Sequence, residues 1–145
     1  MTTVLIANGP NLNRLGTREP DKYGSTSYDE LAALCMQWGA EQGLEVVMRQ
    51  TNDESELVEW MHQAVDSQWG VVLNPAAFTH YSYALRDACA MVTGADLLLI
   101  EVHLTNPHTR EEFRHTSVVS GVATGTIAGF GTDSYRLALS AIAGQ

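Results

Sequence analysis

Apolar runs and helically spaced apolar positions alternate along the chain, beginning with the run TVLIAN at residues 3–8. This run ends at Gly9-Pro10, and a proline disfavours helix at the residue before it. A buried strand followed by a loop is therefore predicted. The loop is expected to reach Ser25, because its stretch REPDKYGS (18–25) is too rich in glycine, proline and charge to favour a strand or a helix.

A helix is predicted from Ser27, and Gly43 stands where that helix would end. Its apolar residues recur at helical spacing, and they are Leu31, Leu34, Cys35 and Trp38. The alternation continues with predicted strands at 44–50 (LEVVMRQ), at 70–74 (GVVLN, ended by Pro75), at 96–102 (DLLLIEV) and at 121–129 (GVATGTIAG). A helix is predicted at 54–67, with Leu57, Met61, Ala64 and Val65 facing inward. Two further helices are marked by the apolar residues Leu85, Ala88, Cys89 and Val92, and by Tyr135, Ala138, Leu139 and Ile142.

Five strands that alternate with helices predict a parallel sheet, because parallel neighbours need crossover connections. Helices on both faces of that sheet make a five-stranded doubly wound α/β fold. No repeat, linker or low-complexity tract interrupts the chain, so residues 1–145 are expected to form one domain. In such sheets ligands bind beyond the carboxyl ends of the strands, which is where a site is expected.

The composition narrows the class of protein. The sequence has no apolar run of about 18 residues and no charged-then-apolar leader, so a cytoplasmic protein is expected. A formal charge of −9 repels nucleic acid and anionic lipid, which argues against both as partners. Yet two predicted loops hold five of the eight basic residues, an arrangement that suits a small anion: Arg14, Arg18 and Lys22 in one loop, Arg110 and Arg114 in the other.

The loops after the first, third and fourth predicted strands carry most of the polar chemistry. These loops and the strand ends that lead into them contain Asn8, Asn11, Asn13, Arg18, Tyr23, Asn74, His80, Glu101, His103, Arg110, Arg114 and His115. Cys35 and Cys89, by contrast, fall on apolar helix faces and are expected in the core, not in a disulfide, a metal site or a nucleophilic role. The fold rule and the polar residues thus indicate the same edge of the sheet.

Several standard sites are missing from the sequence. No G-x-G-x-x-G or Walker loop follows the first strand, and no G-x-S-x-G elbow is present. A receiver domain would carry acidic residues after the first strand, where this chain has asparagines. Glu101 and His103 share a strand face and could bind zinc together with His108 or His115, but their scattered spacing is not typical of a metal site, and no metal is predicted.

Arginine, asparagine, histidine and tyrosine remain, without a thiol or cofactor motif. Guanidinium and amide groups hold carboxylates, while histidine and tyrosine transfer protons. These residues favour an acid–base lyase or isomerase that acts on a small carboxylate. The alternative is a non-catalytic flavodoxin-like module that binds a flavin or another small anion, although GPNLNRLG (9–16) carries large side chains where a phosphate cradle needs small ones.

Four segments resemble the motifs of the type II 3-dehydroquinate dehydratases, namely NGPNLNRLGTREPDKYGS, NPAAFTH, ALRDA and EVHLTNPHTREEFRHTS. The similarity extends from the first predicted strand to the last helix. It implies a flavodoxin-like fold and a homododecamer built from trimers. It also implies the dehydration of 3-dehydroquinate to 3-dehydroshikimate, in the shikimate pathway, without cofactor or metal.

The resemblance also implies the catalytic roles. Tyr23 would be the base that removes a C2 proton beside the ketone, and Arg18 the cation that favours the tyrosinate. His103 would be the general acid for the departing C1 hydroxyl, and Glu101 the residue that orients its ring. Asn11 would stabilise the enolate through an ordered water.

Other motif residues are expected to surround the substrate. By resemblance, Asn74, His80 and Arg114 make polar contacts with the substrate, and the backbone N–H groups of Leu104 and Thr105 hold its carboxylate. Asp87 lies at the edge of the site that a neighbouring subunit lines, and Arg110 shapes or closes the site. The loop at 14–24, framed by Gly16 and Gly24, is expected to be a mobile lid. Two departures from the family pattern, Ala76 in place of glycine and Tyr81 in place of threonine, are expected to alter contacts near Asn74 and His80 only.

Overall fold

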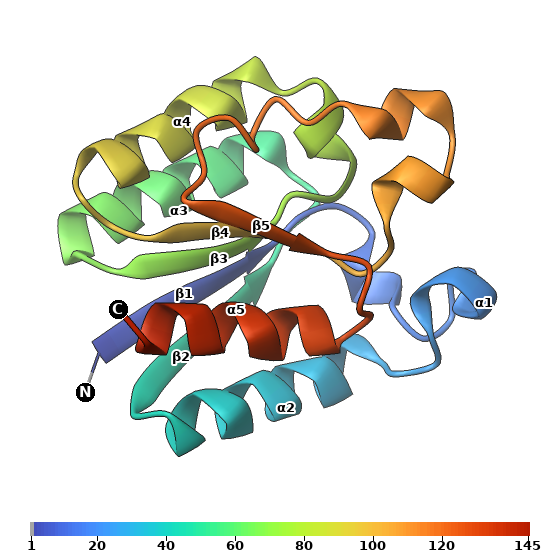
Figure 1. Cartoon of the computed structure of the whole chain (residues 1–145), viewed down its shortest axis with the longest axis horizontal. Helices are drawn as coiled ribbons and strands as arrows, with labels where there is room; N and C mark the ends of the chain where they lie inside the picture. Colours follow the sequence, from blue (N-terminus) through green and yellow to red (C-terminus); the bar gives the residue numbers. More distant parts are fainter. Residues whose placement is uncertain (1) are drawn as a thin grey trace.

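The computed structural model describes residues 2–145, in which five strands form one parallel sheet (Figure 1). The strands are β1 (Thr2–Asn8), β2 (Leu44–Gln50), β3 (Gly70–Asn74), β4 (Leu99–His103) and β5 (Gly125–Ala128). Their order across the sheet is β2-β1-β3-β4-β5, and every neighbouring pair is parallel. This is the flavodoxin-like order of a doubly wound sheet, so the predicted fold class is confirmed.

Two helices cover each face of the sheet, as Figure 1 shows. One face packs against α2 (Tyr28–Glu41) and α5 (Asp133–Ala143), and the other packs against α3 (Glu54–Ser67) and α4 (Tyr83–Gly94). None of these helices, nor any other in residues 2–145, is long and apolar enough to cross a membrane.

The buried strand β1 contributes to both hydrophobic cores. Val4 and Ile6 pack in the core beneath α2 and α5, whereas Leu5 and Ala7 pack in the core beneath α3 and α4. All four side chains have no exposed surface, because successive residues of a strand face opposite sides of a sheet that is covered on both.

The cysteines lie one in each core, as expected. Cys35, on α2, packs in one core, and Cys89, on α4, packs in the other; both are buried free thiols. Burial raises the pKa of each thiol to about 12, so neither forms the reactive thiolate at neutral pH.

The predicted start of the first long helix is confirmed in detail. The hydroxyl of Ser27 accepts a hydrogen bond from the backbone N–H of Glu30 at 3.1 Å, and the Glu30 carboxylate accepts one from the backbone N–H of Ser27 at 3.3 Å. This capping box satisfies two of the amide groups that a helix start leaves free.

The first loop differs from the prediction, because it contains two short helical turns. One is η1 (Leu12–Arg14) and the other is α1 (Pro20–Tyr23), so the expectation that REPDKYGS forms no helix is wrong for residues 20–23. Pro20 occupies the first turn of α1, where its fixed φ suits a helix and its missing N–H removes no intrahelical bond. Gly24, at φ 83°, then ends the turn.

Two predicted strands are shorter than expected. The strand predicted at 96–102 begins at Leu99 and extends to His103, because the chain leaves α4 through a turn in which Asp96 has φ 61°. The strand predicted at 121–129 is paired only over Gly125–Ala128. Before it, the amides of Val122 and Ala123 bond to the carbonyl of Val119 and form a turn in place of a ladder.

The loops after β1 and β3 are held against each other at the carboxyl edge of the sheet. The amide of Gly9 donates to the carbonyl of Asn74 at 2.8 Å. A Cβ atom at Gly9 would lie 2.7 Å from the carbonyl oxygen of Pro75, so only glycine permits this approach. The contact brings the two polar loops to one place.

Candidate active site

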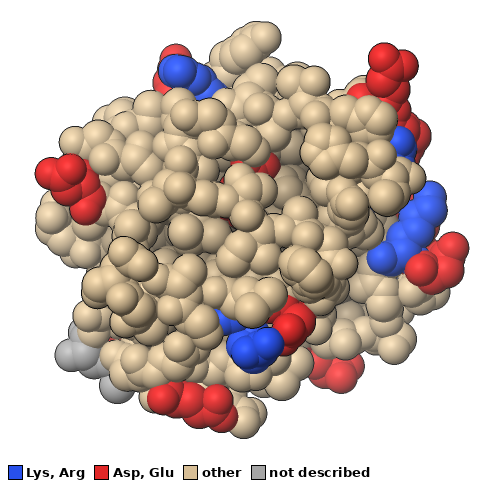
Figure 2. Space-filling view, in the orientation of Figure 1, with Lys and Arg blue, Asp and Glu red and all other residues tan. Residues whose placement is uncertain are grey.

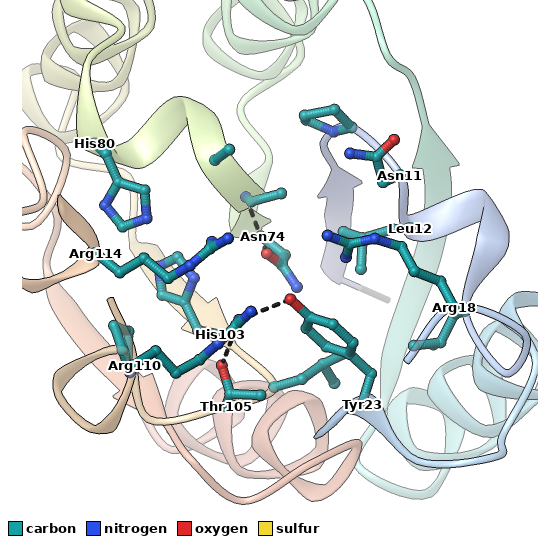
Figure 3. A pocket seen from close by; sticks show the side chains of 16 residues that line it. Asn11, Leu12, Arg18, Tyr23, Asn74, His80, His103, Thr105, Arg110 and Arg114 are labelled. Atoms are coloured by element: carbon teal, nitrogen blue, oxygen red, sulfur yellow. Dashed lines mark hydrogen bonds between the residues drawn. The ribbon is translucent and has the colours of Figure 1, made fainter. Parts of the chain in front are cut away.

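A pocket of about 720 Å³, its open mouth included, lies beyond the carboxyl ends of β1, β3 and β4 (Figure 3). Ten of the twelve predicted site residues line it, namely Asn11, Arg18, Tyr23, Asn74, His80, His103, Leu104, Thr105, Arg110 and Arg114. Glu101 and Asp87 do not.

The phenol of Tyr23 is flanked by two guanidinium groups from different loops (Figure 3). Arg110 Nη1 donates a hydrogen bond to the Tyr23 hydroxyl at 2.7 Å and another to Thr105 Oγ1 at 3.4 Å. Arg18 Cζ lies 5.0 Å from the centroid of the Tyr23 ring, and Arg110 Cζ lies 5.1 Å from it. Two positive charges therefore lie close to the phenol, one of them bonded to its oxygen.

Arg110 is buried with one donor left over. Only 11% of its side chain is exposed, and its Nε has no hydrogen-bond partner among residues 2–145. A buried N–H without an acceptor is costly. Within residues 2–145, Arg110 Nε is the single buried side-chain polar atom that lacks a hydrogen-bond partner.

On the far side of the pocket, His103 is bound to Glu101. Its Nε2 lies 2.6 Å from Glu101 Oε2, at the end of β4, so the predicted shared face is confirmed. Glu101 is completely buried; burial alone would raise its pKa, but hydrogen bonds from His103, Ser120 and Thr79 outweigh that effect and hold the pKa at about 2. Because the carboxylate can only accept, Nε2 carries the hydrogen of that bond and His103 Nδ1 remains available for proton transfer.

His80 and Arg114 form another wall of the pocket. His80 Nδ1 donates to the carbonyl of Thr116 at 2.8 Å, which leaves Nε2 as an acceptor. Burial lowers the pKa of His80 below its ordinary 6.5, although the hydrogen bond to Thr116 opposes this shift, so the neutral form of His80 predominates at pH 7. Arg114 Nε donates to Glu111 Oε1 at 3.1 Å.

The Asn74 amide is fixed from both sides. Its Oδ1 accepts from the amide of Ala76 at 3.1 Å, and its Nδ2 donates to the Tyr135 hydroxyl at 2.9 Å. Tyr135, on α5, is fully buried and donates in turn to Asn8 Oδ1 at 2.7 Å.

Asn11 lies on the opposite wall of the pocket. It adopts a left-handed conformation (φ 72°), which asparagine tolerates better than most residues, and its backbone N–H donates to Asn52 Oδ1 at 2.9 Å.

Among residues 2–145 no group of three or more His, Cys, Asp or Glu side chains is arranged to hold a metal ion. Glu101 and His103 are hydrogen-bonded to each other, and the rings of His108 and His115 are tilted by 35° with their centroids 5.6 Å apart. The zinc cluster considered from the sequence is therefore not formed by these side chains.

Comparison with known proteins gives the family. The family described as Dehydroquinase class II matches residues 2–143. The chain belongs to this family. It is 59% identical over 142 residues to the 3-dehydroquinate dehydratase of Salinispora tropica (98% of this chain, 97% of that protein), and 57% identical over 137 residues to that of Thermus thermophilus (94% and 90%). The crystal structure of type II dehydroquinase from Propionibacterium acnes superposes with a TM-score of 0.96 at 50% identity, covering 100% of this chain and 98% of that one.

In this class II dehydroquinase, Asp87 lies outside the pocket of its own chain. It is exposed on α4, and its carboxylate pairs with Arg86 at 2.8 Å. Tyr81 is likewise outside the pocket, with 59% of its surface exposed and its ring edge-on to Phe78. Ala76 does line the pocket, and its φ of 51° is a left-handed conformation that glycine adopts with less strain.

Some site residues were missed from the sequence. The apolar part of the pocket wall comes from Pro10, Leu12, Leu15, Ala76, Ala77 and Pro107. Three hydroxyls that bind Glu101, on Thr79, Ser117 and Ser120, were missed as well. Apolar residues in a loop give no periodic signal, but NPAAF and GPNLNRL do place small and apolar residues beside polar ones at the strand ends.

The surface charge agrees with an acidic chain that binds an anion locally. Figure 2 shows scattered acidic side chains on one face and its largest group of basic side chains at the right edge, over α1. At α1, Arg18 and Lys22 both pair with Glu19, at 3.5 and 3.2 Å. The remaining guanidinium groups of the site, on Arg110 and Arg114, are largely buried in the pocket wall.

Proposed function

We propose that the protein is a 3-dehydroquinate dehydratase, which removes water from 3-dehydroquinate to give 3-dehydroshikimate in the shikimate pathway. One observation carries the proposal: a tyrosine flanked by two guanidiniums and a histidine bonded to a buried carboxylate face the same pocket. The names of the relatives reported above support the same reaction.

Tyr23 acts as the base. A free tyrosine is almost wholly protonated at neutral pH and is then a poor base. The hydrogen bond from Arg110 to its hydroxyl and the guanidinium of Arg18 near its ring both favour the phenolate. The phenolate takes a proton from C2 of the substrate, and the C–H electron pair moves toward the adjacent ketone to form an enolate.

His103 completes the elimination. The enolate charge is stabilised by Asn11 through an ordered water. As the electron pair returns, the C1–O bond breaks, and His103 Nδ1 gives its proton to the departing hydroxyl, which leaves as water. Glu101 holds the ring through Nε2 and compensates the charge of the protonated imidazole. Exchange with solvent then returns the proton from Tyr23 and restores that of His103.

The remaining hydrogen-bond donors and acceptors of the pocket bind the carboxylate and hydroxyl groups of the substrate. The backbone N–H groups of Leu104 and Thr105, just past β4, hold the carboxylate. The Arg114 guanidinium, His80 Nε2 and the Asn74 amide bind the hydroxyl groups.

We extend the proposal to the state of the whole protein. The chain forms one catalytic domain, residues 1–145, that needs no metal or other cofactor. It works in the cytoplasm as a homododecamer built from trimers, and Asp87, exposed on α4, then reaches the site of a neighbouring subunit.

The proposed reaction has a direct optical test. The product is a conjugated enone, so purified protein mixed with 3-dehydroquinate in the presence of a chelator should give rising near-ultraviolet absorbance. Product formed at the same rate with and without chelator supports a cofactor-free dehydratase. A flat trace at micromolar enzyme would rule the function out.

A further inference from the structure

The carboxylate of Glu101 is surrounded by hydroxyl groups from two other segments. Its Oε2 accepts from His103 Nε2 (2.6 Å), Thr79 Oγ1 (2.7 Å) and Ser117 Oγ (3.0 Å), and its Oε1 accepts from Ser120 Oγ (2.5 Å). Thr79 belongs to η2 (Ala76–His80), whereas both serines lie between η4 (Glu112–His115) and β5. A carboxylate has about four acceptor positions, so this one is saturated.

The hydrogens of this cluster can be assigned from its contacts. Ser117 Oγ accepts from the amides of Val119 (3.2 Å) and Ser120 (3.1 Å), so both its lone pairs are used. Its own hydrogen must then go to Glu101, or to Thr79 Oγ1 at 2.6 Å, which donates onward to Glu101. Either way the hydroxyl hydrogens converge on the carboxylate, and a proton on Glu101 would have to displace one of them.

The saturated carboxylate of Glu101 determines which ring nitrogen of His103 carries the shared hydrogen. With Glu101 unable to donate, the hydrogen between the two residues belongs to His103 Nε2. The nitrogen that faces the chemistry is then Nδ1, on a ring whose side chain is only 12% exposed and which stands in the pocket wall (Figure 3). A carboxyl group that lost these donors could take up a proton and donate to Nε2, which would reverse the tautomer.

We propose that Thr79, Ser117 and Ser120 are positioning residues for His103, because their hydroxyls hold Glu101 as an ionised acceptor and thereby fix Nδ1 as the proton-transferring nitrogen. The proposal rests on the proposed function, in which His103 is the general acid. None of the three lines the pocket that holds Tyr23, so they act through Glu101 without touching substrate.

The tautomer can be measured without turnover. Imidazole ¹⁵N chemical shifts, recorded at a pH high enough for the His103 ring to be neutral, distinguish the two tautomers that remain after the Nδ1 proton is lost or the Nε2 proton is lost, and the His103 signals are assigned by their loss in His103→Gln. We expect the Nε2–H form in the natural protein and a mixture of both tautomers in Ser120→Ala and in Thr79→Val/Ser120→Ala. The matched control is Thr126→Val, since Thr126 is exposed, pairs in register with Glu101 and makes no side-chain hydrogen bond within residues 2–145. Unchanged shifts in the double variant would overturn the proposal.

Kinetics provide the second readout. Ser120 is at the surface, so Ser120→Ala is expected to fold, to lower kcat about tenfold and to leave KM within about twofold. Ser120→Thr should restore kcat, and Thr126→Val should leave it unchanged. In a Glu101→Gln background, Ser120→Ala should have no further effect, because the two changes interrupt the same chain of contacts.

Two kinetic outcomes would contradict the proposal: a Ser120→Ala enzyme indistinguishable from Thr126→Val, or one whose loss adds in full to that of Glu101→Gln. If Glu101→Gln does not fold, the nitrogen shifts of Ser120→Ala still decide the question. Failure of the natural protein to convert dehydroquinate would count against the proposed function alone, since the tautomer is read without substrate.

Discussion

At the scale of single residues, the two arginines beside Tyr23 do different things. Arg110 donates directly to the phenol oxygen, where negative charge would reside, whereas Arg18 lies against the ring and also pairs with Glu19. A charge-assisted hydrogen bond to the atom that carries the charge is stronger than the attraction of a cation over the ring face, which acts at a longer distance. The geometry therefore gives Arg110 the larger share in stabilising the phenolate.

Replacing Arg110 by alanine should lower kcat/KM by about 10- to 100-fold, the value of a hydrogen bond to a charged group. Arg110→Lys should recover part of this loss, because lysine keeps the positive charge but its shorter side chain does not place a donor where Nη1 lies between Tyr23 and Thr105. Steady-state kinetics with Arg136→Ala as the surface control measure the effect. An Arg110→Ala enzyme within twofold of the natural one would disprove this role.

The sequence alone predicted that these residues belong to the site, but it did not predict that Arg110 bonds to Tyr23. Arg18 and Tyr23 are five positions apart in one loop, so their proximity could be read from the chain. The bond between Arg110 and Tyr23 joins residues 87 positions apart, and only the folded sheet brings their loops together. The hydroxyls around Glu101 were missed for the same reason, since Thr79 and Ser120 have no spacing relative to Glu101 that a pattern could show.

At the scale of elements, the loop with η1 and α1 has the construction of a lid. Gly16 and Gly24 have φ of 92° and 83° on either side of its outer part. The backbone bonds of α1 are internal, such as Lys22 N–H to Glu19 and Gly24 N–H to Pro20. Across the pocket, the Tyr23 hydroxyl is joined to Arg110. Opening would break the Tyr23–Arg110 bond and the packing of Tyr23 against the core, while the backbone bonds within α1 could stay intact.

Limited trypsin digestion should therefore cut the ligand-free protein first after Arg14, Arg18 or Lys22. A bound product or substrate analogue should slow those cuts at least several-fold, because it adds contacts on the pocket side of the loop. Mass spectrometry of the early fragments identifies the sites, and cleavage after Arg136, in α5, is the internal reference. First cuts elsewhere, or no protection by ligand, would argue against a lid.

The bounds of a helix or strand were predicted well where residues within that segment determine them. They were predicted poorly where contacts with residues distant in the sequence determine them. The helix beginning after Ser27 has a capping box and a terminating Gly43 within its own sequence. By contrast, GVATGTIAG is apolar throughout, and only its pairing with β4 decides that the strand begins at Gly125. Proline is equally typical of a loop and of the first residue of a helical turn, so Pro20 does not by itself predict α1. The formation of α1 depends on the contacts that Tyr23 makes with the core elsewhere in the fold.

At the scale of the whole molecule, the buried carboxylate that serves the site also contributes to stability. Glu101 connects β4, η2 and the segment before β5 through its hydrogen bonds. Its pKa is held at about 2 instead of the ordinary 4.5, so its stabilisation is complete above pH 4.5 and is lost as the pH falls toward 2.

The free energy of unfolding should consequently fall by about 3 kcal/mol between about pH 5 and pH 2 through this group alone. Glu101→Gln should be less stable at pH 7 and should lack this part of the acid dependence, whereas Glu59→Gln, on the exposed face of α3, should follow the natural protein. Urea unfolding at several pH values measures both. Equal acid slopes for the natural protein and Glu101→Gln would refute the assignment.

The most direct measurement is turnover of 3-dehydroquinate by Tyr23→Phe, followed by near-ultraviolet absorbance beside the surface control Tyr83→Phe. Loss of the phenol oxygen removes the base and should reduce kcat by about 10²- to 10⁴-fold with the fold intact, while Tyr83→Phe, at an exposed position, keeps the natural rate. A Tyr23→Phe enzyme that dehydrates its substrate at the natural rate would contradict the mechanism at its first step.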